Sequence, residues 1–154
     1  MADTITEIPV IRGFPSVATP PKMRLYQNRL TPTFTAAGQE ILFQHVLPDR
    51  YKGGNLRFKL FSTTDQLGAY TWELSFKRLS AGSIYTAAPY TATKILPCTA
   101  ASTLIILIDN ITFTNTELGY SASALDELFL LKVKMNTLPS LAQHGLLNII
   151  VENV

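Results

Sequence analysis

The sequence predicts an all-β fold, a jelly-roll-like antiparallel β-sandwich that follows an extended N-terminal arm. Three observations predict it. Apolar residues recur with a period of two along several short segments, turn-forming residues separate these segments, and no segment keeps a helical period over three turns. Six to eight short strands arranged in this way favour a sandwich or jelly roll over an α/β fold.

The predicted strands differ in how clearly their side chains alternate. Tyr70 to Lys77 alternates most clearly, with Tyr70 and Trp72 on one face and polar residues on the other. The further predicted strands are the weaker segment 40–47, the segment 56–60 in which Arg57 and Lys59 alternate with apolar residues, the apolar run 103–108, its continuation 111–114 past a kink at Asp109-Asn110, and the segments 126–135 and 146–151.

Turns are predicted where residues with a mechanism for turning the chain gather between these segments. They are Pro48-Asp49, Gly53-Gly54, 65–68, 80–82 and 139–145. The Gly53-Gly54 pair is best explained by a turn that requires positive φ, since no phosphate-binding pattern surrounds it. One helix is possible at 116–125, although Gly119 and the serines weaken it.

The first 33 residues differ from the rest and are expected to form an extended arm, with the sandwich domain at 34–154. This segment holds five of the nine prolines, which disfavour a helix or a central strand. It carries four basic and two acidic residues, so its net charge is 4 − 2 = +2, which is the whole net charge of the chain. It is also too apolar for a typical disordered tail, so we expect it to become ordered against a surface, either the chain's own sandwich or a neighbouring subunit.

We expect this arm to bind a partner through apolar anchors and charge pairs. The residues expected to contact the partner are Ile11, Arg12, Phe14, Lys22, Arg24, Tyr26 and Arg29. Addition of a strand to a sheet edge is a common way for an extended segment to bind. The charged fraction of the chain, 16%, is below the usual value of about 25%, which agrees with a partner that covers part of the surface. A β-surface rich in Thr and Ser would give the same low value.

The residues offer no catalytic apparatus and no metal site, so we expect no enzyme activity and no cofactor. Ser, His and Asp occur without a nucleophile-elbow context. His45 and His144 lack a spacing that would bring metal ligands together, and we interpret both as structural or solvated. Asp65 and Glu73 could face each other across a hairpin like the two carboxylates of a glycosidase. A position in a turn for Asp65 and on a solvated strand face for Glu73 explains them better.

Aromatic residues offer an alternative role in glycan binding. Trp72 and Tyr70 share a face with Leu74 and Phe76, so we assign them to the core and not to a sugar-stacking platform. Tyr85 and Tyr90 lie in an Ala- and Thr-rich loop at 81–93 and are the better candidates for exposed contact.

Other partners are disfavoured by simple counts. The alternation of basic and apolar residues at 22–26 offers too few positive charges for strong nucleic-acid binding. The longest apolar run, 104–108, is too short to span a bilayer, so we expect no membrane partner. The N-terminus lacks the pattern of a signal peptide, and the single Cys98 excludes an intramolecular disulfide.

A Pro-Asp-x-Tyr turn at 48–51 is followed by an alternating strand with Leu56, Phe58 and Leu60 and by a later strand centred on Trp72. With this pattern, residues 38–152 resemble small β-sandwich virion proteins of tailed bacteriophages. Near the end, the segment 125–154 is similar to the family pattern, but Lys132 or Lys134 replaces an Arg and the chain ends without the family's Tyr.

This resemblance implies a non-enzymatic structural protein of a virus particle. It leads us to expect a capsid decoration (cement) protein that stabilises the shell, or alternatively a head or tail fibre component with a receptor- or glycan-binding role. The expected partners are copies of itself in a trimer or other symmetric oligomer, and a major capsid or other virion protein. The expected location is the virion, assembled in the host cytoplasm.

Overall fold

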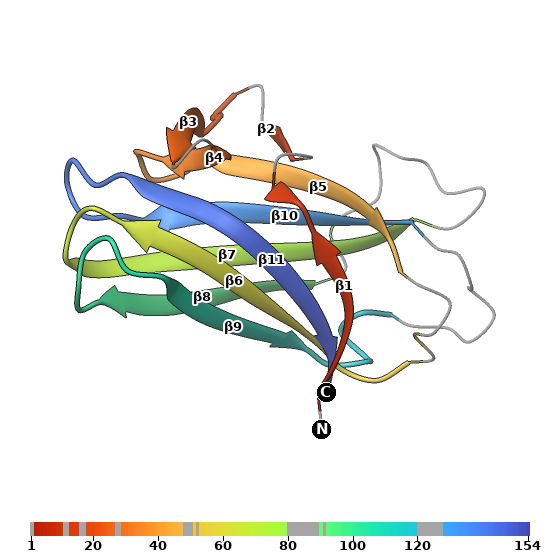
Figure 1. Cartoon of the computed structure of the whole chain (residues 1–154). Helices are drawn as coiled ribbons and strands as arrows, with labels where there is room; N and C mark the ends of the chain where they lie inside the picture. Colours follow the sequence, from red (N-terminus) through yellow and green to blue (C-terminus); the bar gives the residue numbers. More distant parts are fainter. Residues whose placement is uncertain are drawn as a thin grey trace.

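The computed structural model describes residues 2–10, 13–15, 18–26, 29–47, 51, 53–79, 90, 92–119 and 128–154. These residues form two antiparallel sheets that pack face to face (Figure 1). Sheet A contains β1 (Asp3–Ile8), β3 (Lys22–Tyr26), β4 (Arg29–Phe34), β6 (Leu56–Thr64), β9 (Leu107–Phe113) and β11 (His144–Asn153). Sheet B contains β2 (Phe14–Pro15), β5 (Glu40–Val46), β7 (Gly68–Leu79), β8 (Ala92–Ala100) and β10 (Leu128–Thr137).

The strand order is that of a jelly roll. Sheet A follows β3-β4-β11-β6-β9, with β1 also paired to β11, and sheet B follows β2-β5-β10-β7-β8. The eight strands from β4 to β11 therefore build two four-stranded layers, β4-β11-β6-β9 and β5-β10-β7-β8, with connections that pass between the layers. This arrangement confirms the predicted all-β, jelly-roll-like antiparallel sandwich.

The core forms where the inward faces of the two sheets meet. Trp72 is fully buried and lies edge-on to Phe34, with ring centroids 5.4 Å apart. Phe58 from sheet A packs against Phe76 from sheet B with ring centroids 6.2 Å apart, so the aromatic side chains bridge the two layers. The burial of Tyr70 and Trp72 confirms their assignment to the core.

The outward residues of β6 are paired across sheet A. Arg57 and Lys59 both donate to the carboxylate of Glu152 on β11, at 2.7 Å and 3.0 Å. Burial opposes ionisation of this carboxyl group, but the bonds from Arg57 and Lys59 outweigh it and lower the pKa of Glu152. The alternation predicted at 56–60 is thus confirmed, with its basic residues on the outer face.

The Gly53-Gly54 turn is confirmed. Both glycines have positive φ, 101° and 112°, a conformation that side chains rarely adopt. The hydroxyl of the buried Tyr51 donates to the carbonyl of Gly54 at 2.8 Å and holds the turn closed. The predicted turns at Pro48-Asp49 and at 80–82 lie outside the described residues.

The prediction for the apolar run 103–108 was wrong at its start. Residues 101–106 form an exposed loop, and β9 begins only at Leu107. β9 then passes without a break through Asp109-Asn110, where a kink was expected. Apolar character alone indicated a buried strand, but Leu104 has a φ of 59° and cannot continue one.

Other segments also differ from the sequence-based assignment. β8 was not predicted, because its alternating side chains are only half covered and it contains Pro97. The first residues of the possible helix at 116–125 form turns, and 120–127 lie outside the described residues. Residues predicted to be an extended arm form β1, β2 and β3 on the chain's own sheets, and the domain boundary placed after residue 33 falls inside β4.

Candidate functional site

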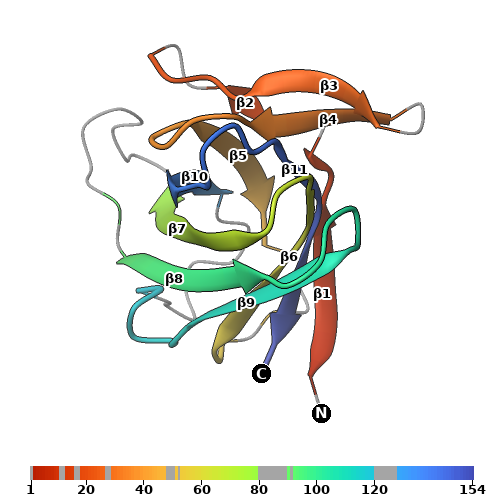
Figure 2. The same cartoon turned by 90° about the vertical axis from the view of Figure 1, so that its left-hand side faces the viewer.

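The β3–β4 hairpin holds four of the five predicted partner-binding residues that the structure describes. β4 pairs with β11 only at Phe34–His144 and Thr33–Gly145, so its residues 29–32 pair with β3 alone. In Figure 2, β3 and β4 lie side by side along one edge of the sandwich. β3 lies at the end of the sheet order, so one of its two edges has no neighbouring strand among the described residues.

Apolar side chains are exposed along this hairpin. Leu25 and Leu30 lie directly opposite each other in the register, and their exposed fractions are 73% and 41%. Met23, two residues before Leu25, is also exposed. A cross-strand pair of leucines is normally found on a covered face, because covering it stabilises the pair. The hairpin therefore presents an apolar surface that the sandwich itself does not cover.

The structure brings four of the predicted arm residues together on the hairpin. Lys22 and Arg29 are exposed, and Arg24 donates to the side-chain carbonyl of Gln143 in the β10–β11 loop. Tyr26 belongs to β3 and pairs with Arg29. Phe14 is exposed on β2, at the edge of sheet B, which lies beside the hairpin in Figure 2.

Two of the predicted arm residues, Ile11 and Arg12, lie outside the described part of the chain, as does the candidate aromatic Tyr85. The sequence singled out basic residues and aromatics in this segment, but it did not single out Leu25 or Leu30. Two short runs that each contain apolar residues, on either side of Gln27-Asn28 in the sequence, are the signal that would have paired them.

A second surface is the outer face of sheet B, where Tyr90 lies. The ring of Tyr90 is half-buried, and the Lys132 ammonium group lies 4.7 Å from the ring centre. Farther along β10, Lys134 lies 3.6 Å from the carboxylate of Glu73, which also accepts a hydrogen bond from Asn136 at 2.9 Å. Glu73 is thus paired and half-buried, rather than solvated as expected. The face offers one aromatic ring beside a row of hydrogen-bonding side chains.

A polar cluster lies inside the sandwich. Asp109 on β9 accepts hydrogen bonds from the hydroxyl of Tyr70 at 2.8 Å and from the indole nitrogen of Trp72 at 2.9 Å. Burial, then the bond to Asp109, raises the pKa of Tyr70, and burial is the main cause that raises the pKa of Cys98 to about 12. Neither group therefore ionises near neutral pH.

His144 belongs to the same interior region. It is fully buried, its Nε2 lies 2.9 Å from the hydroxyl oxygen of Ser62, and its ring centre lies 4.5 Å from that of Tyr70. Burial lowers the pKa of His144 to about 4, so the ring is neutral at pH 7. Because Ser62 and His144 have no exposed surface, a substrate cannot reach the pair, and their arrangement supports a structural role.

His45 also has structural partners. It lies 2.7 Å from the hydroxyl of Thr6 on β1 and packs against Phe129 at 5.8 Å. Within the described ranges there is no group of three or more His, Cys, Asp or Glu side chains that could hold a metal ion. Among the same residues, no helix is long and apolar enough to cross a membrane.

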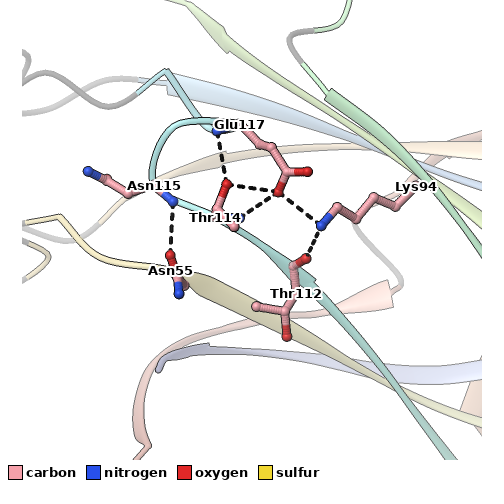
Figure 3. Close-up of polar contacts among 6 residues, drawn as sticks. All are labelled: Asn55, Lys94, Thr112, Thr114, Asn115 and Glu117. Carbon is pink, nitrogen blue, oxygen red and sulfur yellow. Dashed lines mark hydrogen bonds and ion pairs between the residues drawn. The ribbon is translucent and has the colours of Figure 1, made fainter.

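The turn after β9 is fixed by a set of polar contacts, shown in Figure 3. The Glu117 carboxylate accepts the backbone N–H of Thr114 at 2.7 Å, and the Thr114 hydroxyl accepts the N–H of Glu117 at 3.3 Å. This reciprocal pair is a capping box. Lys94 on β8 joins it, with its Nζ 2.9 Å from Glu117. The bond from Thr114, followed by that from Lys94, lowers the pKa of Glu117, and the cluster holds the turn against β8.

Comparisons with known proteins identify the fold but no family. No protein-family model and no curated protein matches the chain. The CBM36-1 domain of a multidomain xylanase from the hindgut metagenome of Trinervitermes trinervoides is a similar solved structure, with a TM-score of 0.55 and 6% identity over 97% of this chain and 96% of that one. The insecticidal delta-endotoxin Cry8Ea1 from Bacillus thuringiensis gives a TM-score of 0.59 and 12% identity over 97% of this chain and 24% of that one. At such low identity these similarities establish a shared β-sandwich fold alone.

Proposed function

We propose that the chain is a non-enzymatic structural protein of a virus particle, and that its β3–β4 hairpin binds a neighbouring subunit. The observation that carries the proposal is the exposed Leu25–Leu30 pair on the β3–β4 hairpin, at the end of sheet A. Covering these leucines would be worth about 25 cal/mol for each Å² of apolar surface before ordering costs.

The free edge of β3 supplies a second means of binding. An edge strand presents unpaired backbone N–H and C=O groups, and a strand of the partner can add to them. Lys22 and Arg29 flank the apolar pair and favour an acidic neighbour. Each contact is weak alone, but repetition in a symmetric oligomer or on a shell makes the total strong.

The virus particle as the setting rests on the resemblance at 38–152 to small virion proteins of tailed bacteriophages. In this setting the partners are copies of the chain, in a trimer or another symmetric oligomer, and a major capsid protein. The role is then that of a decoration or cement protein, since the sandwich and the hairpin bind two surfaces at once.

Light scattering tests the hairpin. The variant Leu25→Thr with Leu30→Thr removes the apolar pair but keeps residues that suit a strand. The control Val46→Thr changes an exposed residue at the end of β5, away from the hairpin. We expect an oligomer for the unaltered chain and for the control, and a monomer for the double variant. An oligomer of unchanged mass in the double variant would refute the hairpin as the interface.

A second candidate function is glycan recognition on the outer face of sheet B. Tyr90, held over Lys132, supplies a ring for stacking, and the side chains of Glu73, Lys134 and Asn136 supply hydrogen bonds. This function predicts that Tyr90→Ala abolishes binding on a glycan array, while Leu25→Thr leaves it unchanged. An array on which the unaltered chain binds nothing would remove this candidate.

A further inference from the structure

One end of the sandwich is built from four loops that connect the two sheets. They are the β4–β5 loop (35–39), the β6–β7 loop (65–67), the β8–β9 loop (101–106) and the β10–β11 loop (138–143). Figure 1 shows them together at the left-hand end of the molecule. Leu104 N donates to Thr64 O at 2.8 Å, and Gln143 N donates to the Asp65 carboxylate at 2.7 Å, so three of the loops are joined by hydrogen bonds.

Aliphatic side chains project from these three joined loops. We call them the loop-end patch, and they are Leu67 (58% exposed), Leu104 (72%), Ile105 (47%), Ile106 (65%) and Leu141 (87%). Three of the five belong to the apolar run that the sequence placed in a buried strand. Large aliphatic side chains gathered on one exposed end of a protein often mark a functional surface.

The backbone at two of these residues is held in an unfavourable conformation. Leu104 has a φ of 59° and Leu141 a φ of 62°, and they are the only non-glycine residues with positive φ among those described. Glycine or asparagine adopts this conformation at less cost than leucine. At two positions on the same end of the molecule, a leucine therefore adopts a backbone conformation that favours glycine or asparagine. Both leucine side chains are exposed. Such violations are expected at functional sites.

The end is almost free of charge. The four loops contain one charged residue, Asp65, and its carboxylate is engaged by the N–H of Gln143. Beside them, Arg24 donates to the side chain of Gln143, and Lys22 is exposed on the same strand. The surface thus consists of aliphatic tips with basic groups next to them and no free acidic group within the loops.

These features fit a lipid surface better than a second protein. Five partly exposed side chains present a few hundred Å² of apolar surface, whereas a stable protein interface buries about 800 Å² on each partner. Tips on three separate loops can enter a deformable apolar layer without a complementary shape. The adjacent Arg24 and Lys22 then lie at the level of the lipid phosphates.

We propose that the loop-end patch inserts into the outer layer of a lipid membrane. From the sequence we expected no membrane partner, because the apolar run 104–108 is too short to span a bilayer. Shallow insertion of loops, however, needs no spanning segment. This surface is separate from the hairpin leucines, so the proposal stands independently of the proposed assembly function.

Vesicle flotation tests the insertion. The variant Leu104→Asn with Leu141→Asn removes two tips, and asparagine suits the positive φ at both sites, so the fold is preserved. The matched control Val46→Asn with Val154→Asn removes two exposed valines, at the end of β5 and at residue 154, that belong neither to the loop-end patch nor to the hairpin. We expect the unaltered chain and the control to float with phosphatidylcholine vesicles, and the loop variant to bind at least about tenfold more weakly.

Three outcomes would overturn the proposal. The first is that the unaltered chain does not bind vesicles. The second is that the loop variant binds vesicles as well as the control does. Equal binding of the two variants to vesicles that contain phosphatidylglycerol would belong to this outcome, since it would show binding through charge alone. The third is that light scattering shows the loop variant, but not the control, losing self-association, which would assign the patch to contacts between copies of the chain.

Discussion

The inner strands of the sandwich and the β3–β4 hairpin follow the same alternating pattern but place their apolar residues in opposite environments. On β6, Leu56, Phe58 and Leu60 are fully buried between the sheets. On the hairpin, Leu25 of β3 and Leu30 of β4 are exposed opposite each other, where β4 does not pair with β11. An alternating pattern therefore identifies a strand, whereas its position in the sheet determines whether its apolar face is covered.

Because of this difference, apolar residues of the inner strands contribute to the free energy of unfolding, whereas those exposed on the hairpin contribute to the free energy of association. Inner strands contribute to the free energy of unfolding, because their side chains leave water when the chain folds. Leu25 stays largely in water in the isolated chain, so most of its apolar surface can contribute only to association. The comparison fails if substitutions in the two regions have similar effects on stability.

Removal of the central aromatic side chain is expected to have the largest effect. Trp72→Ala should lower the free energy of unfolding by about 3–5 kcal/mol, because it opens a cavity beside Phe34 and His144. Chemical denaturation measures this loss, and Trp72→Phe, which keeps an aromatic ring, should lose less. A loss below about 1 kcal/mol for Trp72→Ala would show that the core is not packed as described.

Loss of the interior acceptor should come next. Asp109→Ala leaves the Tyr70 hydroxyl and the Trp72 indole N–H without their acceptor, and should cost about 2–4 kcal/mol of unfolding free energy. Asp109→Asn keeps an acceptor oxygen and should cost less. Equal stability of Asp109→Ala and the unaltered chain in urea would mean that the two donors find water instead.

Acidification should destabilise the chain through His144. Its pKa is about 4 when folded and about 6.5 in an unfolded chain, so between these values the unfolded state binds more protons. The free energy of unfolding should therefore fall as the pH falls from 7 to 4.5, by about 2 kcal/mol from this residue.

The control for this prediction is His144→Gln, which removes the titrating group. Denaturation curves at pH 7 and pH 4.5 should show a smaller loss between the two pH values in this variant than in the unaltered chain. The same loss in both would assign the acid sensitivity to other groups.

The sequence predicted the inner strands well, because burial on one face leaves a clear period of two. β5, β6, β7, β10 and β11 lie where that period placed them, and the core position of Trp72 followed from its neighbours. β8 was missed because it lies at the edge of sheet B, where exposed residues blur the period. Asp109 was assigned to a kink, because its inward position depends on donors that are distant in sequence.

The candidate surfaces were harder to predict for a physical reason. An exposed leucine and a buried leucine are identical in the sequence, so the run at 103–108 indicated a strand, and Leu25 and Leu30 counted only toward the apolar content of the arm. The proline-rich segment was expected to be an arm, and the structure places much of it in β1, β2 and β3 on the chain's own sheets.

The smallest effect on stability is expected at the hairpin and completes the comparison. Leu25→Thr should change the free energy of unfolding of the isolated chain by about 0.5 kcal/mol or less, because its side chain stays in water in the folded and unfolded states. The same substitution at the fully buried Leu60, Leu60→Thr, should cost several times more, since a buried leucine loses both its contacts and its transfer free energy. Both variants are measured by urea denaturation at concentrations low enough to keep the chain monomeric. A large loss at Leu25 would mean that the hairpin packs on the chain's own body in solution, and its leucines would then belong to the folding core instead of to a docking surface.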